Sequence, residues 1–241
     1  MTICMHFFTL IVKVLTLPLK LMEAVGMYGI YKRFFPFVIY KLSASYNVKM
    51  KEKKMDLFSN LSDFKGNRPL RILEIGCGTG ANFEFFPPGS SVICVDPNPH
   101  FKKYLQKSMS VNDHITFESF VVAAAEDMGA MKDNSMDVIV STLVLCSVDD
   151  TPRTLREAHR ILRPGGAFYF LEHVVADPSS WTYFFQHVLQ PLWYYFGDGC
   201  ELIRATWKDL EAAGFSELKL RHISTPLSYL VKPHVMGYAV K

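Results

Sequence analysis

The feature that most constrains this chain is an apolar run followed at once by closely spaced glycines. Residues 70–75 are typical of a buried strand, and Gly76-Cys77-Gly78-Thr79-Gly80 follows them, before residues compatible with a helix. Such glycines let the backbone turn sharply, and they let a ligand approach the main chain without a Cβ atom in the way. The order strand, glycine loop and helix predicts an α/β domain with a ligand site at this turn.

Strand-like and helix-like segments alternate after this loop, which is typical of a parallel sheet with covering helices. Helices are expected between the predicted strands, which are residues 70–75, 91–95, 115–121, 136–141 and 166–171. The last part differs, because a helix over residues 206–213 is followed by two consecutive strands, at 217–223 and 235–240. We therefore expect a mostly parallel sheet with an antiparallel C-terminal edge.

The N-terminal part is dominated by large apolar side chains, whereas charged residues reach an ordinary globular frequency from Lys49 onward. Its polar residues recur at steps of three or four along one stripe of a helix. They are His6, Thr9, Lys13, Thr16, Lys20 and Glu23. Such a helix can lie in a membrane interface, whereas a spanning helix would bury Lys13 near the bilayer centre. We expect a membrane-anchoring helix or hairpin over residues 1–42 and a catalytic domain over residues 43–241.

Two other arrangements of the N-terminal part stay open. Pro18 is expected to kink the helix, and a hairpin can return through Gly26, Gly29 and Pro36. A cleaved secretory signal is the main rival, because Ala24 and Gly26 supply small residues at a suitable spacing. The extreme N-terminus carries no basic residue, however, and apolar residues continue beyond the cleavage position, so a retained anchor is favoured.

Charge and cysteine content limit the kinds of partner and site that we expect for this chain. The formal net charge is only +3, and the one lysine-rich run lies between Lys49 and Lys54, so no nucleic-acid partner is expected. That run fits either a solvated helix face or contact with a membrane surface. The five cysteines form no CxxC pair, which indicates neither a zinc site nor a disulfide framework. A reducing, cytosol-facing catalytic domain fits best.

An acidic residue stands where a nucleoside-binding loop requires one. Asp96 ends the second predicted strand, about twenty residues after Gly76, where its carboxylate can accept hydrogen bonds from both ribose hydroxyls. Gly76, Gly78 and Ala81 also satisfy the spacing of a nicotinamide dinucleotide site. Asp96 can equally be a turn residue in its Asp-Pro-Asn-Pro sequence. The loop alone therefore leaves the ligand open.

The run Glu74-Ile75-Gly76-Cys77-Gly78-Thr79-Gly80 resembles the first motif of class I methyltransferases, in which an acidic residue precedes the glycine loop. The resemblance implies a Rossmann-like class I methyltransferase fold with S-adenosyl-L-methionine as the cofactor. Three further segments match that family in chain order, at residues 125–128, 134–140 and 161–166. The cofactor-binding residues that it implies are Glu74, Gly76, Gly78, Gly80, Asp96, Pro97, Ala125, Glu126 and Leu143.

One position departs from the pattern, because Ala124 stands where many members of that family carry an aspartate for the adenine amine. Adenine recognition through the backbone of Ala125 and Glu126, or through the Glu126 side chain, stays open.

A narrower resemblance, to the methyltransferase-like protein 7 family, rests on residues 78–83, 96–101, 142–148 and 197–200. It spans nearly the whole catalytic domain, and the N-terminal segment shares the family's apolar character. It implies transfer of a methyl group to the sulfur of small or apolar alkyl thiols. It also implies attachment to the endoplasmic reticulum membrane and lipid droplets, with the catalytic domain facing the cytosol.

Methyl transfer from a sulfonium is an in-line displacement that requires positioning and exclusion of water, and no metal. His173 and Cys146 are the candidate catalytic residues, because they follow the fifth and fourth predicted strands, where ligands of parallel sheets bind. Glu172 and Ser147 lie beside them. His173 can also be a hydrogen-bonded histidine that closes its loop, and Cys146 a small apolar filler.

Two features near the C-terminal third have two interpretations each. Asp198 and Cys200 belong to a glycine-rich turn that is either a plain loop or a substrate lid. The aromatic residues between Trp181 and Phe196 are either helix core or an apolar wall around the substrate.

Three other functions compete with thiol methylation. The fourth- and fifth-strand motifs also resemble quinone C-methyltransferases, so a quinone or lipid acceptor is one alternative. A cofactor-binding lipid-droplet interaction protein without turnover is another. A nicotinamide oxidoreductase comes last, because it has no comparable need for Glu74.

Overall fold

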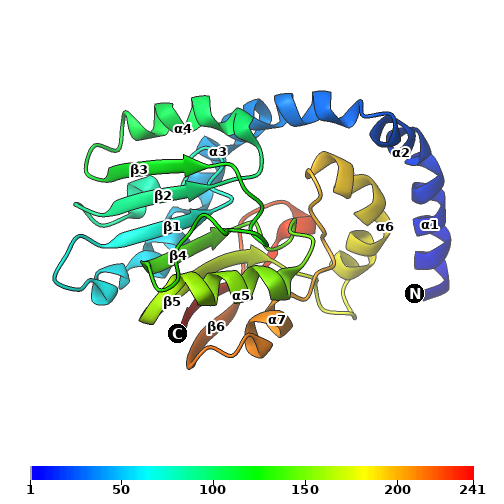
Figure 1. Ribbon diagram of the computed structural model, residues 1–241. Coiled ribbons are helices and arrows are strands. Elements are labelled where there is room, and N and C mark those ends of the chain that lie inside the picture. Colours follow the sequence, from blue (N-terminus) through cyan, green and yellow to red (C-terminus); the bar gives the residue numbers. More distant parts are fainter. Residues whose placement is uncertain (1) are drawn as a thin grey trace.

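The computed structural model describes residues 2–241, and its centre is a sheet with the strand order β3-β2-β1-β4-β5-β7-β6 (Figure 1). The first five strands are parallel, and β7 pairs antiparallel with both β5 and β6. This arrangement confirms the expected Rossmann-like sheet with its antiparallel C-terminal edge. The bounds are β1 Arg71–Ile75, β2 Ser91–Val95, β3 Thr116–Val121, β4 Met136–Thr142, β5 Leu162–His173, β6 Glu217–Ser224 and β7 Pro233–Val240.

Helices cover both faces of the sheet, because alternate side chains of each buried strand point to opposite sides. Leu73 and Ile75 of β1 join a core with residues of α5 and α7, whereas Ile72 joins a second core with residues of α3 and α4. The bounds of the helices are α1 Thr2–Leu15, α2 Leu17–Ala24, α3 Tyr28–Phe58, α4 Lys102–Met109, α5 Thr151–Ile161, α6 Trp181–Phe196 and α7 Thr206–Ala212.

The prediction of a helix directly after the glycine loop is wrong. Residues 76–90 form turns and a single 3-10 turn, Phe83–Phe85, and the consecutive prolines Pro87 and Pro88 cannot continue a helix. The C-terminal half of α3 covers this face instead, with Met50 and Leu57 buried in the core. A helix from the N-terminal part of the chain thus replaces the expected local one.

The helix expected between β3 and β4 is also absent among the described residues, which form turns from residue 122 to residue 135. Side chains of α5 hold this segment through its backbone. Arg160 donates to the carbonyl oxygens of Met128 and Met131, and Glu157 accepts from the Met128 amide. Asn134 adopts a left-handed conformation with φ of 52°, which ends any helical path.

The N-terminal helices are broken at two places. α1 and α2 meet at an angle of 45° just before Pro18, as the kink prediction requires, and a turn at Gly26 separates α2 from α3. Gly29 and Pro36 lie inside α3, so the chain does not return through them. The predicted domain boundary after residue 42 also lies inside this continuous helix.

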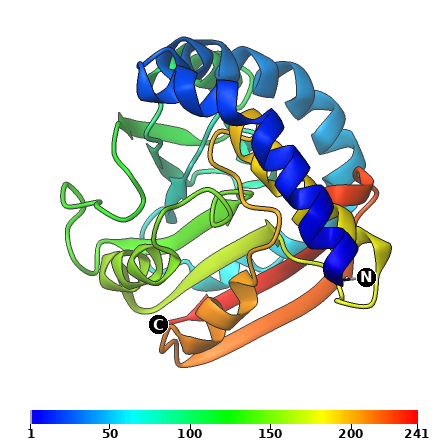
Figure 2. The ribbon, with the colours of Figure 1, turned by 90° about the vertical axis from the view of Figure 1, so that its right-hand side faces the viewer.

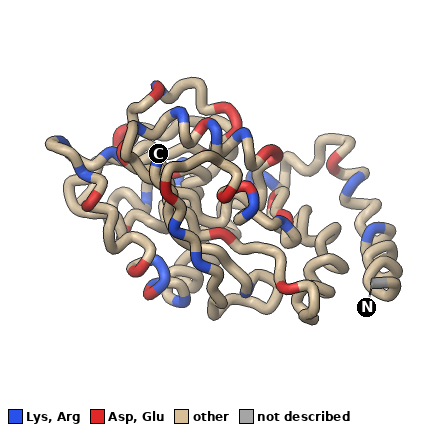
Figure 3. Tube along the Cα trace, turned by 90° about the horizontal axis from the view of Figure 1, so that it is seen from below, with Lys and Arg blue, Asp and Glu red and all other residues tan. Residues whose placement is uncertain are grey.

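The N-terminal helices α1 and α2 differ from the rest of the chain in carrying few charged residues. Among residues 2–241 no single helix is long and apolar enough to cross a membrane, and only the bent pair α1–α2 reaches that length together. α1 packs along α6, where the Thr9 hydroxyl donates to the His187 carbonyl oxygen at 3.3 Å (Figure 2). Charged residues are sparse on this end of the chain and frequent over the sheet domain (Figure 3).

The pairing of β7 with the edge strand β6 depends on Gly237, because a Cβ atom there would lie 1.8 Å from the Lys219 carbonyl oxygen of β6. We expect Gly237→Ala to lower the free energy of unfolding by about 1–3 kcal/mol, since the strands must separate to admit the methyl group. Denaturant unfolding in detergent, followed by circular dichroism, measures the change. Gly29→Ala is the matched control, because nothing lies within 4 Å of its added Cβ and alanine favours the helix. Equal stability of Gly237→Ala and the parent chain would contradict the expectation.

Candidate cofactor and thiol site

The glycine loop between β1 and the 3-10 turn provides an open backbone surface. Gly76, Gly78 and Gly80 have φ values of 57°, 50° and 74°, which side chains rarely adopt. A Cβ atom at Gly76 would lie 2.5 Å from the Val144 side chain, whereas one at Gly78 would meet nothing closer than the Phe101 ring at 3.7 Å. The space above Gly78 is therefore the part of the loop that a ligand can enter.

Asp96 lies against this loop at the carboxyl end of β2. Its Oδ2 accepts from the Gly78 amide at 3.0 Å and its Oδ1 accepts from the Asn98 amide at 2.8 Å. Burial raises the pKa of Asp96 to about 6, although both backbone hydrogen bonds oppose the rise. The adjacent Pro97 is exposed. A carboxylate oriented in this way keeps lone pairs for the two hydroxyls of a ribose.

Glu74 lies beneath the loop in a buried polar network. Its Oε1 accepts from the Asn82 side-chain amide at 2.7 Å, and its buried Oε2 has no protein partner. Burial raises the pKa of Glu74 to about 7. Asn82 also donates to the Thr142 hydroxyl at 3.0 Å and so links β1 to β4. Such an unpartnered buried oxygen is unusual in a folded protein and points to a role of Glu74 beyond packing.

Lys54 of α3 is fully buried beside this network, whereas Lys49 and Lys51 of the same run are exposed, so the interpretation of the run as a solvated or membrane-facing surface is wrong for Lys54. Its ammonium group donates to Asn47 Oδ1 at 2.7 Å and to the Ala81 carbonyl oxygen at 3.1 Å. Burial lowers the pKa of Lys54 to about 8. The sequence indicated that Lys54 lies on the core-facing side of the helix, because Met50, Lys54 and Leu57 share the spacing of one helix face.

The predicted cofactor-binding residues Ala125, Glu126 and Leu143 lie beyond the carboxyl ends of β3 and β4. Glu126 accepts from the Asp149 amide at 2.6 Å, just before α5, so its side chain already holds the start of that helix. Recognition of adenine by Ala125 and Glu126 stays a prediction. Leu143 has a left-handed φ of 59°, and its amide donates to the Leu171 carbonyl oxygen.

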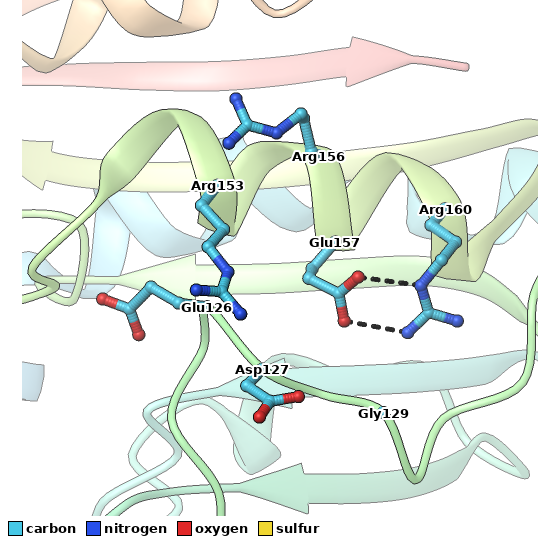
Figure 4. Close-up of a pocket in the computed structure, with 7 residues that line it drawn as sticks. All are labelled: Glu126, Asp127, Gly129, Arg153, Arg156, Glu157 and Arg160. Carbon is cyan, nitrogen blue, oxygen red and sulfur yellow. Dashed lines mark hydrogen bonds and ion pairs between the residues drawn. The ribbon is translucent and has the colours of Figure 1, made fainter.

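A charged hollow of about 330 Å³ lies between the loop that carries Glu126 and helix α5 (Figure 4). Its wall is formed by Glu126, Asp127, Gly129, Arg153, Arg156, Glu157 and Arg160. It contains none of the glycine-loop residues, and the cofactor-binding residues predicted from sequence lie elsewhere, apart from Glu126.

The two predicted catalytic residues, His173 and Cys146, lie together with Cys200 in one cluster, which the sequence did not indicate. His173 Nε2 lies 3.0 Å from Cys200 Sγ, and Cys200 Sγ lies 3.4 Å from Cys146 Sγ. All three side chains are buried, and the indole N–H of Trp193 donates to Cys200 Sγ at 3.2 Å. No local sequence motif indicates the contact among these three residues, because they come from separate segments that only the fold brings together.

The ionisable groups of this cluster perturb one another. The hydrogen-bonded contact between the two thiols lowers the pKa of Cys200, while that contact and burial raise the pKa of Cys146. Burial opposes the charged form of His173, but the contact with Cys146 and the nearby Glu172 raise its pKa overall. A catalytic role for His173 and Cys146 stays a prediction.

Glu172 has a structural task that its position in sequence did not reveal. Its Oε2 accepts from the Val144 and Leu145 amides at 2.9 and 3.2 Å, and its Oε1 accepts from the Ser141 hydroxyl at 2.8 Å. Both carboxylate oxygens are thus used to shape the loop after β4. This leaves Glu172 poorly suited to accept a proton from a substrate.

The N-terminal helix α3 closes over the ligand end of the sheet. The Asn98 side chain donates to the Lys32 carbonyl oxygen at 2.8 Å, and the Lys32 ammonium lies 3.9 Å from Asp198. Tyr28 donates to the Tyr195 carbonyl oxygen at 2.8 Å, which ties α3 to the end of α6. The apolar segment expected to be an anchor therefore also contributes to the site.

The aromatic residues of α6 serve in part as helix core, and their role as an apolar wall around the substrate stays a prediction. Phe184 and Tyr195 are buried, and Phe184 contacts Phe8 of α1 with ring centroids 6.4 Å apart. Trp181 and Phe196 remain exposed. The helix thus packs on α1 and still leaves apolar surface open.

Comparisons with known proteins agree with this geometry. Residues 73–170 match the family model described as a methyltransferase domain. The chain is 57% identical to human thiol S-methyltransferase TMT1A over 87% of each chain, and 49% identical to human thiol S-methyltransferase TMT1B over 100% of each.

Solved structures show the same fold. A crystal structure of a SAM-dependent methyltransferase from Aquifex aeolicus matches with a TM-score of 0.57 and 16% identity, over 85% of this chain and 97% of that chain. The resemblance found in the sequence motifs is confirmed, and S-adenosyl-L-methionine is the cofactor that this family and fold require. The chain belongs to the methyltransferase family that includes the thiol S-methyltransferases TMT1A and TMT1B.

Proposed function

We propose that this protein transfers the methyl group of S-adenosyl-L-methionine to the sulfur of small or apolar alkyl thiols at a membrane surface. The observation that carries the proposal is the open backbone at Gly78 between Asp96 and the unpartnered oxygen of buried Glu74. The thiol acceptor is supported by the names of the relatives TMT1A and TMT1B.

The residues around the loop fit the parts of that cofactor. Asp96 is oriented to hold the ribose hydroxyls, and the backbone around Gly76 and Gly78 can receive the methionine part. The free oxygen of Glu74 can accept a hydrogen bond from the ammonium group of the cofactor's methionine part. The cofactor supplies a methyl group on a sulfonium, and the protein must hold the acceptor in line with it and exclude water.

A membrane location is supported by the exposed apolar surface of the N-terminal helices. Large exposed side chains of α1 and α2 include Ile3, Phe7, Phe8, Leu10, Ile11, Val14, Leu15, Leu17, Leu21 and Met22. An apolar surface of this size, with a few basic residues beside it, suits burial in a membrane interface. We propose that α1 and α2 hold the catalytic domain at the endoplasmic reticulum membrane or a lipid droplet, on the cytosolic side.

The acceptor assignment predicts a clear order of substrates. Purified full-length protein with labelled cofactor should give S-methylated product from small apolar thiols, and little from phenols or quinones. Gly78→Val should abolish product, because a side chain would fill the space that the methionine part needs. Gly89→Val, at an open left-handed turn away from the loop, controls for backbone strain alone. Product from quinones and none from any thiol would overturn the acceptor assignment, and bound cofactor with no product at all would indicate an interaction protein.

Cofactor affinity should depend on pH through Asp96. Its folded pKa of about 6 means that acid protonates the carboxyl and removes an acceptor for the ribose. We expect Asp96 to raise the dissociation constant by up to about tenfold per pH unit below this value, with a separate contribution from Glu74 near its pKa of about 7. Asp96→Ala should weaken binding by roughly ten- to hundredfold at neutral pH, through loss of hydrogen bonds to a charged acceptor. Calorimetry over this pH range measures both effects, and Asp96→Asn should flatten the profile.

The cofactor-free fold should respond to pH in the opposite direction, which keeps the two effects separable. A carboxyl whose folded pKa is raised stabilises the fold below its ordinary pKa, and that stability is lost as pH rises through the folded value. Asp96 and Glu74, with folded pKa values of about 6 and about 7, should therefore make the melting temperature of the parent chain fall relative to that of an Asp96→Asn, Glu74→Gln variant as the pH rises from 4 to 7. A difference between parent and variant that rises over this interval, with no bound cofactor, would contradict the assignment.

Membrane binding should depend on the exposed face of α1. Replacing Phe7, Leu10 and Val14 by serine should reduce binding to phosphatidylcholine vesicles by at least about tenfold, because apolar area no longer leaves water. Flotation of the full-length chain measures bound and free protein. The matched control replaces three exposed valines outside α1 and α2, which are Val48, Val111 and Val122. Equal loss in both triple variants, or a parent chain that does not float, would refute the proposal.

A further inference from the structure

The cluster of two thiols and an imidazole beside the glycine loop has the composition of a metal site. Cys146 follows β4, His173 ends β5 and Cys200 follows α6, and one ligand atom from each lies within 4.8 Å of the other two. The Sγ atoms of Cys146 and Cys200 are 3.4 Å apart, and His173 Nε2 lies 3.0 Å from Cys200 Sγ. All three side chains are buried.

These separations are close to those that tetrahedral zinc imposes. With Zn–S bonds of about 2.3 Å and Zn–N bonds of about 2.1 Å, two sulfur ligands lie about 3.7 Å apart, and sulfur and nitrogen about 3.6 Å apart. The Sγ–Sγ distance would have to grow by about 0.3 Å and the distance from His173 Nε2 to Cys200 Sγ by about 0.6 Å. A disulfide would instead require the two sulfur atoms to approach to about 2.0 Å and an oxidant to accept two electrons.

The donor set selects the kind of ion. Two thiolates and an imidazole suit zinc, whereas magnesium and calcium require oxygen ligands. The nearest carboxylate along the chain, Glu172, already uses both oxygens to hold Ser141 and the loop after β4. Three protein ligands leave the fourth zinc position open, which is the arrangement of catalytic rather than structural zinc sites.

The surroundings support the sulfur ligands. The indole N–H of Trp193 donates to Cys200 Sγ at 3.2 Å, and the Ser147 hydroxyl lies 3.5 Å from Cys146 Sγ. Hydrogen bonds of this kind orient metal ligands and moderate their charge. The Arg204 guanidinium donates to the Leu145 carbonyl oxygen at 2.7 Å, which places a positive charge next to the loop that carries Cys146.

The cluster also lies on the ligand side of the sheet. β4 and β5 are neighbours, and Val144, two residues before Cys146, packs against Gly76 of the glycine loop. The turn that precedes Cys200 carries Asp198, which faces Lys32 of α3. An ion held by the three residues would therefore lie between the cofactor loop and the apolar surface of α6.

We propose that Cys146, His173 and Cys200 bind one Zn²⁺ ion, and that the thiol substrate becomes its fourth ligand as a thiolate. This inference rests on the proposed function for the identity of the substrate. On coordination the thiol would release its proton to solvent. The thiolate sulfur would then form a bond to the methyl carbon, while the bond from that carbon to the sulfonium breaks and leaves its electron pair on the departing sulfur. No oxidant or reductant is consumed.

The first test measures zinc in the full-length protein after removal of metal and dialysis against Zn²⁺. We expect about one zinc per chain, and a loss of affinity above about 100-fold in Cys146→Ser and Cys200→Ser, since loss of even an outer partner typically costs 10–100-fold. Cys94→Ser is the matched control, because Cys94 is equally buried in β2 and lies outside the cluster. Cofactor binding by calorimetry shows that each variant is folded.

The second test uses the parent chain with Co²⁺ in place of zinc and S-adenosylhomocysteine in the cofactor site. A thiol that binds the metal should strengthen the sulfur-to-cobalt absorption as a third thiolate joins two, without any turnover. No change at saturating thiol, or zinc binding that survives both serine substitutions, would overturn the proposal. A Cys146–Cys200 disulfide in protein purified without reductant would overturn it in favour of a redox pair.

The two proposals can fail separately. Zinc bound at the cluster with a normal cobalt response to thiol, but without methylated product, would uphold the metal site and refute the proposed function. Thiol methylation that persists after complete removal of metal, and in both serine variants, would uphold the function and refute the metal site.

Discussion

A buried polar network beneath the glycine loop is the constraint on which the rest of the site depends. Lys54 and Asn47 of α3 both donate to the Ala81 carbonyl oxygen, and Asn82 donates to Glu74 and Thr142. Three segments that are distant in sequence, α3, residues 74–82 and the end of β4, are thereby fixed to one another. Since buried charges are costly unless they are paired or hydrogen-bonded, the network favours a single arrangement of the loop.

The network also explains why α3 belongs to both halves of the molecule. Its C-terminal half takes the place of the helix that is missing after β1, and its N-terminal half lies over the loop after β2 through Asn98 and Lys32. α1 and α2 precede it and rest on α6. Binding of the N-terminal helices to a membrane would therefore act on a helix that directly borders the cofactor site.

The site separates two kinds of chemistry along one edge of the sheet. Carboxylates gather at the ends of β1 and β2, where a cationic cofactor would be stabilised by Glu74 and Asp96. Sulfur and imidazole groups gather beyond β4 and β5, where a soft nucleophile would be held. A parallel sheet makes this division natural, because the carboxyl ends of its strands meet at the same edge.

The sequence by itself determined the sheet and the cofactor loop. Their signals are local: apolar strands, glycines that need left-handed backbone, and an acidic residue at the end of β2. It failed where a distant segment took over a local role, as when α3 replaced the helix expected after Gly80. Only the tertiary structure decided that Glu172 shapes a loop, and that Cys146, His173 and Cys200 meet. Such contacts join residues far apart in the chain, and no periodicity or spacing records them.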